Sequence, residues 1–472
     1  MNIFERQVGG RRYRVASQSL WDPAKQRPFA RQAVLGSADP APVADLSATA
    51  TVGTRLVGDV GALIWVAEQL DLIKLIDQAC GLKAPRGGPT VGEMVLAVAV
   101  QRACAPAAKC HLAAFLESCV PLLSCLPAAT FTGQSFHRLA AQVTDEHLER
   151  AQIEIARSVL RRFELSTDVL AFDTTNFDTF IATTTPGELA RRGHAKSKRK
   201  DLRVVGLATL VSETGHVPLL HRTYPGNGSD QTVLGECMDA LGKLHQALDE
   251  GDRRTRPGCR TIVRDGGSWS EQLELDLDIA GYYTLISLTL SHSASQLALE
   301  HAAQRGVMKR LGGKLGDVRA ARLRLPVGEA GLDRTLVVVE SVELQRGQKR
   351  GIAVALRKAK VELSKLERLA AKGRVERQIL EGRVQKTLQR EHLSEFVEAT
   401  VKESEGRLSL HWHVDAGRRR LLERTRLGRR VLCTDHHNWS NGRITGVMVG
   451  SCMLSAGSGT WRNSSAEPRR AG

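Results

Sequence analysis

The sequence predicts an α/β protein with a mixed β-sheet, and three features of the 472 residues indicate this fold class. Apolar runs of strand length alternate with helical patterns between residues 165 and 290. The runs at 169–173 and 261–265 each end in an aspartate, as a buried strand does when it delivers a carboxylate to the edge of a sheet. Helical patterns dominate residues 51–164. We therefore expect a sheet preceded by a helical N-terminal domain and interrupted by an inserted α+β region.

Composition narrows the setting in which the protein acts. The chain has 67 Lys and Arg against 51 Asp and Glu, a formal net charge of +16. A globular protein this basic usually binds polyanions, nucleic acid first and an anionic membrane surface second, and no long basic amphipathic helix supports the second. Nine cysteines without a CxxC pair indicate reduced thiols in a cytosolic protein. The first 30 residues lack an apolar signal core and no run approaches 18 apolar residues, so we expect neither secretion nor a membrane span.

The N-terminal third divides into two predicted parts. Residues 1–50 alternate polar and apolar and predict a small β-rich cap. In the helical domain at 51–164, Thr90 and Glu93 have the spacing of a capping box at the start of one helix. Further helices are expected at 61–70 and 145–163. Such a helical bundle could contain a helix-turn-helix that binds DNA, or it could have a purely structural role. No local sequence signature distinguishes these two roles.

Residues 165–290 form the first part of the predicted sheet domain. We expect five strands and two helices, in this order: strands at 168–173, 202–211 and 217–224, a helix at 231–248, a strand at 259–265, a helix at 270–279 and a strand at 282–288.

Residues 291–430 are expected to interrupt this domain. Apolar residues at helical spacing between 356 and 370 predict a helix that Gly373 ends, and a second helix should run from 375 towards 396. We expect this helical hairpin to pack on strands at 336–339 and 408–414. Two roles for this inserted region remain open: a structural element with a charged, solvated surface, or an arm that grips DNA. Residues 431–472 should hold one last core strand and an aberrant tail.

The two aspartates suggest metal-dependent chemistry. Attack on a phosphodiester commonly uses two divalent cations about 4 Å apart, and Mg²⁺ prefers hard oxygen ligands. Asp173 fits as the ligand that bridges both ions, and Asp265 as the second ligand. An isolated aspartate at such a place is more often a turn cap. The pairing of two strand-end aspartates favours the metal site.

Five blocks of sequence, taken in order, resemble those of insertion-sequence transposases with a DDE catalytic domain. The resemblance covers about 165–290 closely, although Gly266-Gly267 departs from the pattern after the second aspartate. The blocks are 172–176 (FDTTN), 192–202 (RGHAKSKRKDL), 205–218, 225–230 (PGNGSD) and 263–270 (VRDGGSWS).

This resemblance implies a ribonuclease H-like core with Asp173 and Asp265 as catalytic residues. It also implies Mg²⁺ as cofactor, with Mn²⁺ as a substitute. The reaction would be cleavage at the ends of a mobile element, followed by attack of the freed 3′-hydroxyl on target DNA. The implied partners are double-stranded DNA and a second copy of the chain, in a bacterial, nucleoid-associated cytoplasmic setting.

A basic run lies between the first two strands of this core. Phosphate contacts from such a run supply affinity for DNA that is independent of sequence, although a solvated loop has the same composition. The candidate DNA-binding residues are Arg191, Arg192, His194, Lys196, Lys198, Arg199, Lys200 and Arg203.

Two histidine clusters also suggest metal ligands, but less strongly than the two aspartates do. His411 and His413 flank a tryptophan on a predicted strand and should share one face, opposite that tryptophan. His436 and His437 follow Asp435 at the end of the last expected core strand. We do not assign a histidine metal site to either.

The third carboxylate of the family is missing from the place where the resemblance puts it. After 441–444 the residues become small, with no evident helical period, and 445–472 contain a single glutamate, Glu467. Neither Glu467 nor Asp435 has a predicted helical setting, so neither is expected to replace it.

A frameshift near codon 446 would explain the change. Read one nucleotide out, synonymous codons for residues 447–463 can encode Tyr-Gly-Arg-Gln-Leu-His-Val-Glu-Arg-Arg-Phe-Arg, with the glutamate across the codons of Leu454 and Ser455. We therefore expect little or no strand transfer from the chain as written. The alternative function is a catalytically inactive DNA-binding remnant of a transposase, and a host nuclease of the same fold is a weaker third.

Overall fold

The computed structural model describes residues 2–22, 27–38, 58–119, 130–182, 184–193, 195–197, 199, 201–249, 260–304, 306–373, 375–404 and 407–454. The chain divides into two compact units. The first comprises Met1–Val57 and Ser118–Val120, and the second comprises Gly58–Glu117 and Pro121–Gly472.

The first unit contains a three-stranded antiparallel sheet of β1 (Asn2–Val8), β2 (Arg11–Asp22) and β3 (Arg27–Ser37), in that order. Gly9 and Gly10 form the two-residue turn between β1 and β2, both with positive φ, which favours glycine in such hairpins. The β-rich pattern of residues 1–50 forms this sheet across its described part.

The second unit begins with helices. The predicted capping box is confirmed, because the Glu93 N–H donates to Thr90 Oγ1 at 3.1 Å and the Thr90 N–H donates to Glu93 Oε2 at 2.8 Å. No single described helix is long and apolar enough to span a bilayer, and one pair bent by 100° passes that test only jointly. The helices are α1 (Gly58–Gln69), α2 (Leu72–Cys80), α3 (Val91–Cys104), α4 (Leu112–Ser118), α5 (Gly133–Ala140) and α6 (Asp145–Arg162).

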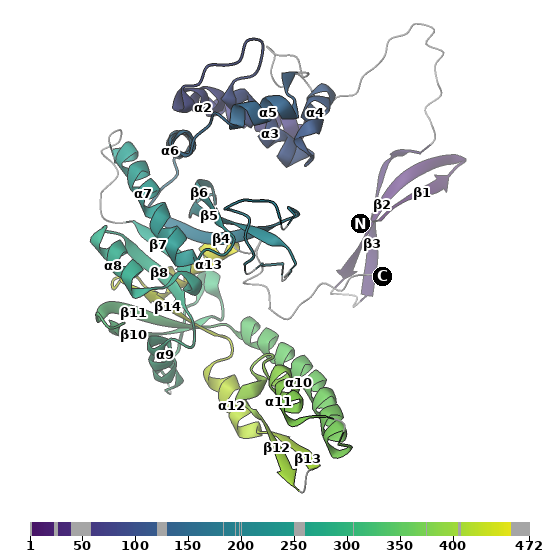
Figure 1. Ribbon diagram of the computed structural model, residues 1–472, viewed down its shortest axis with the longest axis vertical. Helices are drawn as coiled ribbons and strands as arrows, with labels where there is room; N and C mark the ends of the chain where they lie inside the picture. Colours follow the sequence, from purple (N-terminus) through teal and green to yellow (C-terminus); the bar gives the residue numbers. More distant parts are fainter. Residues whose placement is uncertain are drawn as a thin grey trace. The chain divides into compact units, whose positions relative to one another are not determined.

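A nine-stranded mixed sheet follows, in the order β6-β5-β4-β7-β8-β14-β11-β10-β9 (Figure 1). Strands β4, β5 and β6 pair antiparallel, whereas β7 pairs parallel with both β4 and β8. The predicted strand and helix order of residues 165–290 is confirmed, and this mixed α/β architecture is consistent with a ribonuclease H-like fold. The elements are β4 (Val169–Thr179), β5 (Arg203–Ser212), β6 (Pro218–Pro225), α7 (Asp230–Asp249), β7 (Thr261–Asp265), α8 (Glu271–Ile279) and β8 (Tyr283–Leu288).

The rest of the sheet is antiparallel and comes from later in the chain. Its strands pair with β8 through β14, so the sheet extends past β8 without a break. The added elements are α9 (Ser293–Ala303), β9 (Lys309–Arg310), β10 (Arg319–Val327), β11 (Leu332–Glu340), β14 (Arg429–Thr434) and α13 (Asn441–Leu454).

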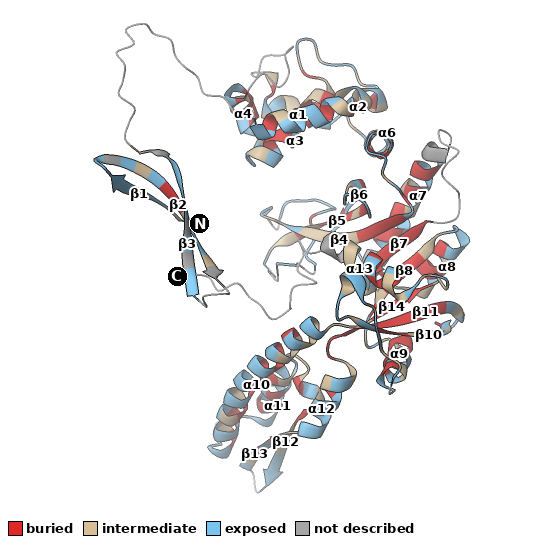
Figure 2. Ribbon diagram, turned by 180° about the vertical axis from the view of Figure 1, so that it is seen from behind, coloured by how far each residue is buried: buried red, intermediate tan, exposed pale blue. Residues whose placement is uncertain are grey.

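Helices cover both faces of this sheet, as Figure 2 shows by burial. Helices α6, α7 and α8 pack on one face, over buried residues such as Leu170, Phe172 and Ile262. Helix α9 packs on the same face of the later strands. Helix α13 covers the opposite face, over Val169 and Val263.

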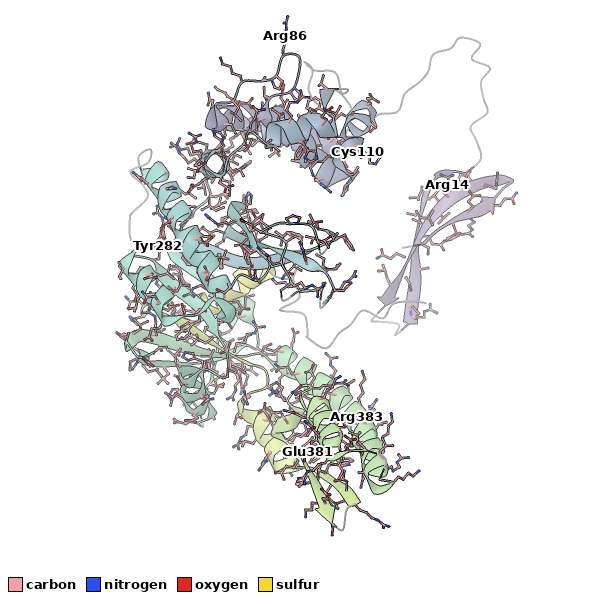
Figure 3. The ribbon with its side chains drawn as sticks, viewed as in Figure 1. Arg14, Arg86, Cys110, Tyr282, Glu381 and Arg383 are labelled. Atoms are coloured by element: carbon pink, nitrogen blue, oxygen red, sulfur yellow. The ribbon has the colours of Figure 1, made fainter. Side chains whose placement is uncertain are left out.

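The chain between β11 and β14 forms an insertion with its own apolar core. Sequence analysis predicted the helical hairpin correctly but placed strand 336–339 beneath it, which is wrong. Residues 336–339 belong to β11 and pair with β14 in the main sheet, and the hairpin packs on the β12–β13 ribbon instead. Glu381 and Arg383, labelled in Figure 3, mark the second helix of the hairpin. The elements are α10 (Val342–Ala371), α11 (Arg377–Leu388), β12 (Val397–Ser404), β13 (Arg407–Val414) and α12 (Ala416–Thr425).

Helix α13 corrects a second expectation. Sequence analysis expected no helix after residue 445, and the structure has one as far as Leu454. Ile444, Val447 and Met448 fall at helical spacing and are buried against the sheet. Burying each such side chain stabilises by about 1.5–3 kcal/mol, whereas a glycine in a helix costs about 1 kcal/mol relative to alanine. Burial therefore outweighs the poor helix propensity of this segment.

Candidate active site

The two predicted aspartates lie on neighbouring parallel strands. Asp265 ends β7, whereas β4 continues past Asp173 to Thr179, so the predicted strand end at residue 173 is wrong. The pairing of β4 with β7 runs from Val169 opposite Thr261 to Ala171 opposite Val263. Continued by two residues, this register sets Asp173 opposite Asp265. Adjacent strands lie about 4.8 Å apart, so we expect the two aspartates to lie close together.

Both aspartates also share one face of the sheet. Side chains alternate between faces along a strand. Val169 and Val263 belong to the apolar cluster beneath α13, and they precede Asp173 and Asp265 by an even number of residues. The aspartates therefore belong to the face that α13 covers, where α13 contacts β7 and β8.

Local hydrogen bonds hold both carboxylates, that of Asp173 within β4 and that of Asp265 at the end of β7. Asp173 is half-buried, and its Oδ1 accepts the Thr174 N–H at 2.9 Å. Asp265 is exposed, and its Oδ1 accepts the Gly266 N–H at 2.8 Å. The departure from the family pattern at Gly266 has a local cause, because a Cβ there would lie 2.4 Å from the Ser287 carbonyl oxygen. Only glycine fits this close approach of the turn to β8.

A buried ion network lies behind Asp265, and sequence analysis missed it. The Arg264 side chain is fully buried, forms an ion pair with Glu274 on α8, and donates to the Ser268 carbonyl at 2.8 Å. Ser268 Oγ in turn donates to the Asp265 carbonyl at 2.8 Å. Burial lowers the pKa of Arg264 to about 10. The available signal was an arginine inside an apolar strand, since a buried arginine needs a partner.

The basic loop between β4 and β5 folds back along β4. The Lys196 N–H donates to Asn176 Oδ1 at 3.0 Å, and the Lys196 ammonium contacts the Thr174 carbonyl, one residue from Asp173. The structure thus places one predicted DNA-binding cation beside the candidate metal site.

The other described cations of this loop have varied surroundings. Arg191 pairs through its backbone with Val204 in β5, and Arg203 donates to the Thr185 carbonyl at 2.7 Å. Arg199 forms an ion pair with Asp201 and Arg192 is exposed. The remaining predicted residues, His194, Lys198 and Lys200, lie outside the described residues.

Asp435 does not join the two aspartates. It follows β14, and its Oδ1 accepts the Thr284 N–H at 2.9 Å, whereas Asp265 pairs with Ser287. These positions are three residues apart along β8, about 10 Å. Burial raises the pKa of Asp435 to about 6. Glu467, the other carboxylate near the C-terminus, lies outside the described residues.

Helix α13 itself carries neither Asp nor Glu. Across the part of the chain that the structure describes, no group of three or more His, Cys, Asp and Glu is placed to hold a metal ion. The donor set is therefore two carboxylates of the kind that Mg²⁺ prefers, without a third.

The histidine clusters have structural surroundings. His413 pairs with Glu398 at 3.4 Å while Trp412 packs on the insertion core, as the predicted alternation requires. His436 stacks between Tyr283 and Trp439, with ring centroids 4.2 and 3.7 Å away.

The buried position of His436 predicts a pH effect on stability. Burial, aided by Arg443 and His437, lowers the pKa of His436 from 6.5 to about 4. Below pH 6.5 His436 binds a proton in the unfolded chain but stays neutral in the folded chain. The contribution of His436 to the free energy of unfolding therefore falls as the pH falls towards 4. The raised pKa of Asp435 acts oppositely, because its contribution is lost as pH rises from 3.8 to about 6.

His436→Phe keeps an aromatic ring in the stack and removes the first of these pH effects, together with the pH-independent contribution of the 2.7 Å hydrogen bond between His436 Nε2 and Thr261 Oγ1. The variant should therefore lose less stability than the unaltered chain between pH 7 and pH 5, with Asp435 contributing equally to both. Urea unfolding at the two pH values measures this. Equal losses in both proteins would show that folding does not lower the pKa of His436.

Comparisons with known proteins add little to this geometry. No protein-family model and no curated protein sequence matches the chain. Among solved structures, the chain is similar to the piggyBac transposase in a synaptic complex with hairpin DNA, with 14% identity, a TM-score of 0.26, and coverage of 59% of this chain and 57% of that one. It is also similar to the Mos1 transposase in a paired-end complex with the left transposon end, with 13% identity, a TM-score of 0.18, and coverage of 46% and 64%. The matched part spans less than two thirds of either transposase, and at such scores neither match carries an argument about this chain.

Proposed function

We propose that this chain is a DDE-type insertion-sequence transposase whose active site lacks its third acidic ligand. The observation that supports the proposal is the pairing of β4 with β7 as far as Ala171 and Val263, because the same register, if continued by two residues, would bring Asp173 opposite Asp265 on one face of the sheet. The order of the first five strands, β6-β5-β4-β7-β8, supports a ribonuclease H-like core. The five blocks of sequence that resemble the family lie within the same region.

The residues present have defined roles in such a site. Asp173 would hold both divalent ions and Asp265 would hold one of them. When bound, Mg²⁺ or Mn²⁺ would activate a water or 3′-hydroxyl for attack and stabilise the leaving oxygen. Lys196, beside Thr174, would contact the phosphate backbone near the scissile bond. The partners would be double-stranded DNA and a second copy of the chain on paired element ends.

A cleavage assay tests the chemistry. We expect the unaltered chain to bind duplex DNA taken from the two sides of its gene, with little or no Mg²⁺-dependent cleavage. This result favours the alternative function, an inactive DNA-binding remnant, for this particular chain. Cleavage that Asp173→Ala abolishes would instead establish an active enzyme with two carboxylates. Cleavage that both Asp173→Ala and Asp265→Ala leave unchanged would overturn the assignment of the site.

Salt dependence tests the DNA-binding role of the loop. Replacing Arg191, Arg192 and Lys196 by alanine removes three cations, and each phosphate that is no longer neutralised should reduce the slope of log K against log salt by about 0.9. We expect a reduction of roughly two to three in gel-shift titrations at several salt concentrations.

The insertion offers a control with the same change in charge. Arg357, Lys360 and Lys365 are exposed on α10, and alanine at all three should leave the slope nearly unchanged if the insertion is a structural element. Equal reductions in both triple variants would make the insertion a DNA-gripping arm. A reduction in the α10 variant alone would overturn the role of the loop.

A further inference from the structure

Apolar side chains are exposed at the end of β4 and in the segment that follows. Phe177 is 56% exposed, Phe180 84%, Ile181 46% and Leu189 44%. Burying such a side chain normally stabilises a protein by about 1.5–3 kcal/mol, and a cluster left in water commonly marks a binding surface. We call Phe177, Phe180, Ile181 and Leu189 the aromatic segment.

The aromatic segment begins on the same strand as Asp173. The pairing of β4 with β5 continues to Thr179, eight residues beyond the last pair with β7 at Ala171, so the β4–β5 ribbon extends past β7. Phe177 lies four residues after Asp173 and on the same face by alternation, about 13 Å along the strand. A DNA strand held at the aspartates would therefore pass this ribbon within two or three nucleotides.

Cations flank the exposed ring of Phe180. The Arg199 guanidinium lies 5.9 Å from the ring centroid, within range of a cation–π contact. Between residues 177 and 203 the sequence has seven Lys and Arg against three Asp and Glu. Large apolar rings among cations suit a nucleic acid strand, which offers flat bases and anionic phosphates together. A protein partner with an apolar face would gain nothing from this excess of positive charge.

The chemistry of the Phe180 ring indicates whether it would contact paired or unpaired bases. Bases in a duplex present only their edges, which proteins read through hydrogen bonds, and a phenylalanine ring has no donor or acceptor. The flat face of a base becomes available only when the base is unstacked or unpaired. Phe180 therefore suits an unpaired nucleotide and is poorly suited to duplex recognition.

We propose that Phe180, supported by Arg199, is a base-stacking contact for an unpaired DNA nucleotide at the end of β4, several nucleotides from the candidate metal site. This inference rests on the proposed function and names the form of DNA that the site holds. The strand would lie along the β4–β5 ribbon, with its phosphates against the cations of the loop and one base on the Phe180 ring.

Binding of oligothymidylate and of a duplex of equal length tests the proposal. Both are measured by fluorescence anisotropy with the full chain and without divalent cation, so cleavage does not enter. Phe180→Ala should weaken binding to oligothymidylate by about 5- to 150-fold, the range for loss of one stacked base, and change duplex binding less than about twofold. Phe180→Trp should restore the single-strand affinity.

Ile279→Ala is the matched control, because Ile279 is also 84% exposed and lies on α8. It should change neither affinity. Unchanged oligothymidylate binding by Phe180→Ala, or an equal loss on duplex, would overturn the proposal. A change of oligomeric state in Phe180→Ala without loss of single-strand binding would do the same and would identify a contact between copies.

The outcomes for this inference and for the proposed function are separable. Failure to bind either DNA would overturn both. If cleavage is lost in Asp173→Ala but the affinity for oligothymidylate is unchanged in Phe180→Ala, this inference is overturned and the proposed function is left intact. Stacking by Phe180 without any metal-dependent chemistry, even after the missing carboxylate is supplied, would do the reverse.

Discussion

A glutamate introduced at position 454 should give the chain Mg²⁺-dependent DNA cleavage, which we expect to be weak or absent in the chain as written. Codons shifted by one nucleotide place a glutamate across Leu454 and Ser455, and Leu454 is the last residue of α13. Position 454 follows the buried Val447 by seven residues, about two helical turns along the helix that covers the aspartate face. A third carboxylate would complete the donor set of Asp173 and Asp265.

The expected gain is large because the missing group acts on the transition state. Loss of one transition-state-stabilising group in an active site commonly costs about 10²–10³ in rate, and a metal ligand should be worth at least as much. We expect Leu454→Glu, and more fully a chain restored to the shifted frame, to raise cleavage of the flanking DNA by at least about 10²-fold. Product formation on labelled duplex in Mg²⁺ and in Mn²⁺ measures this gain.

Two controls separate the ligand from a general effect of charge. Gly446→Glu adds the same charge to an exposed position of α13 and should produce no cleavage. Leu454→Glu combined with Asp173→Ala should be inactive. Cleavage by the unaltered chain at the rate of the Leu454→Glu variant would contradict the need for a third carboxylate. Sequencing the gene for a single-base shift near codon 446 checks the origin of the defect independently.

Glu274→Ala should destabilise the sheet domain by about 3–5 kcal/mol, the cost of breaking a buried ion pair by removing one partner. The Glu274 side chain is only 2% exposed, pairs with Arg264, lies 3.5 Å from Arg334, and accepts from Thr284 Oγ1 at 3.0 Å. Arg334 keeps a second partner in Asp278, but Arg264 has no other carboxylate among its described ion pairs. The variant therefore leaves a buried guanidinium without its counter-charge.

Urea unfolding measures this loss as a lower midpoint at an unchanged slope. Glu149→Ala is the control, because Glu149 pairs with Lys243 at 2.7 Å in a partly exposed position, and such pairs contribute about 0–1 kcal/mol. Equal midpoints for the two variants would show that the buried network contributes no more than a surface pair. Since Arg264 and Ser268 also hold the backbone of Asp265, weaker Mn²⁺ binding should accompany the loss of stability.

Local signals predicted most of the core elements. The apolar runs before Asp173 and Asp265 became β4 and β7, and the spacing of Thr90 and Glu93 became a capping box. Such patterns depend on neighbours within one turn or one strand, and these neighbours are visible in the sequence. The same reasoning failed at 336–339, where an apolar strand suits an insertion core and the main sheet equally well.

The sequence by itself determined that two apolar strand patterns each lead into an aspartate, that a basic loop follows the first, and that residues 441–454 contain no Asp or Glu. Only the tertiary structure decided that β7 lies next to β4, in a register that, if continued, would bring Asp173 opposite Asp265. It also decided that Asp435 lies elsewhere, that α13 folds despite its glycines, and that Arg264 is neutralised by Glu274. Strand order, burial and ion pairing join residues far apart in the chain, and their free energy depends on contacts that no local pattern contains.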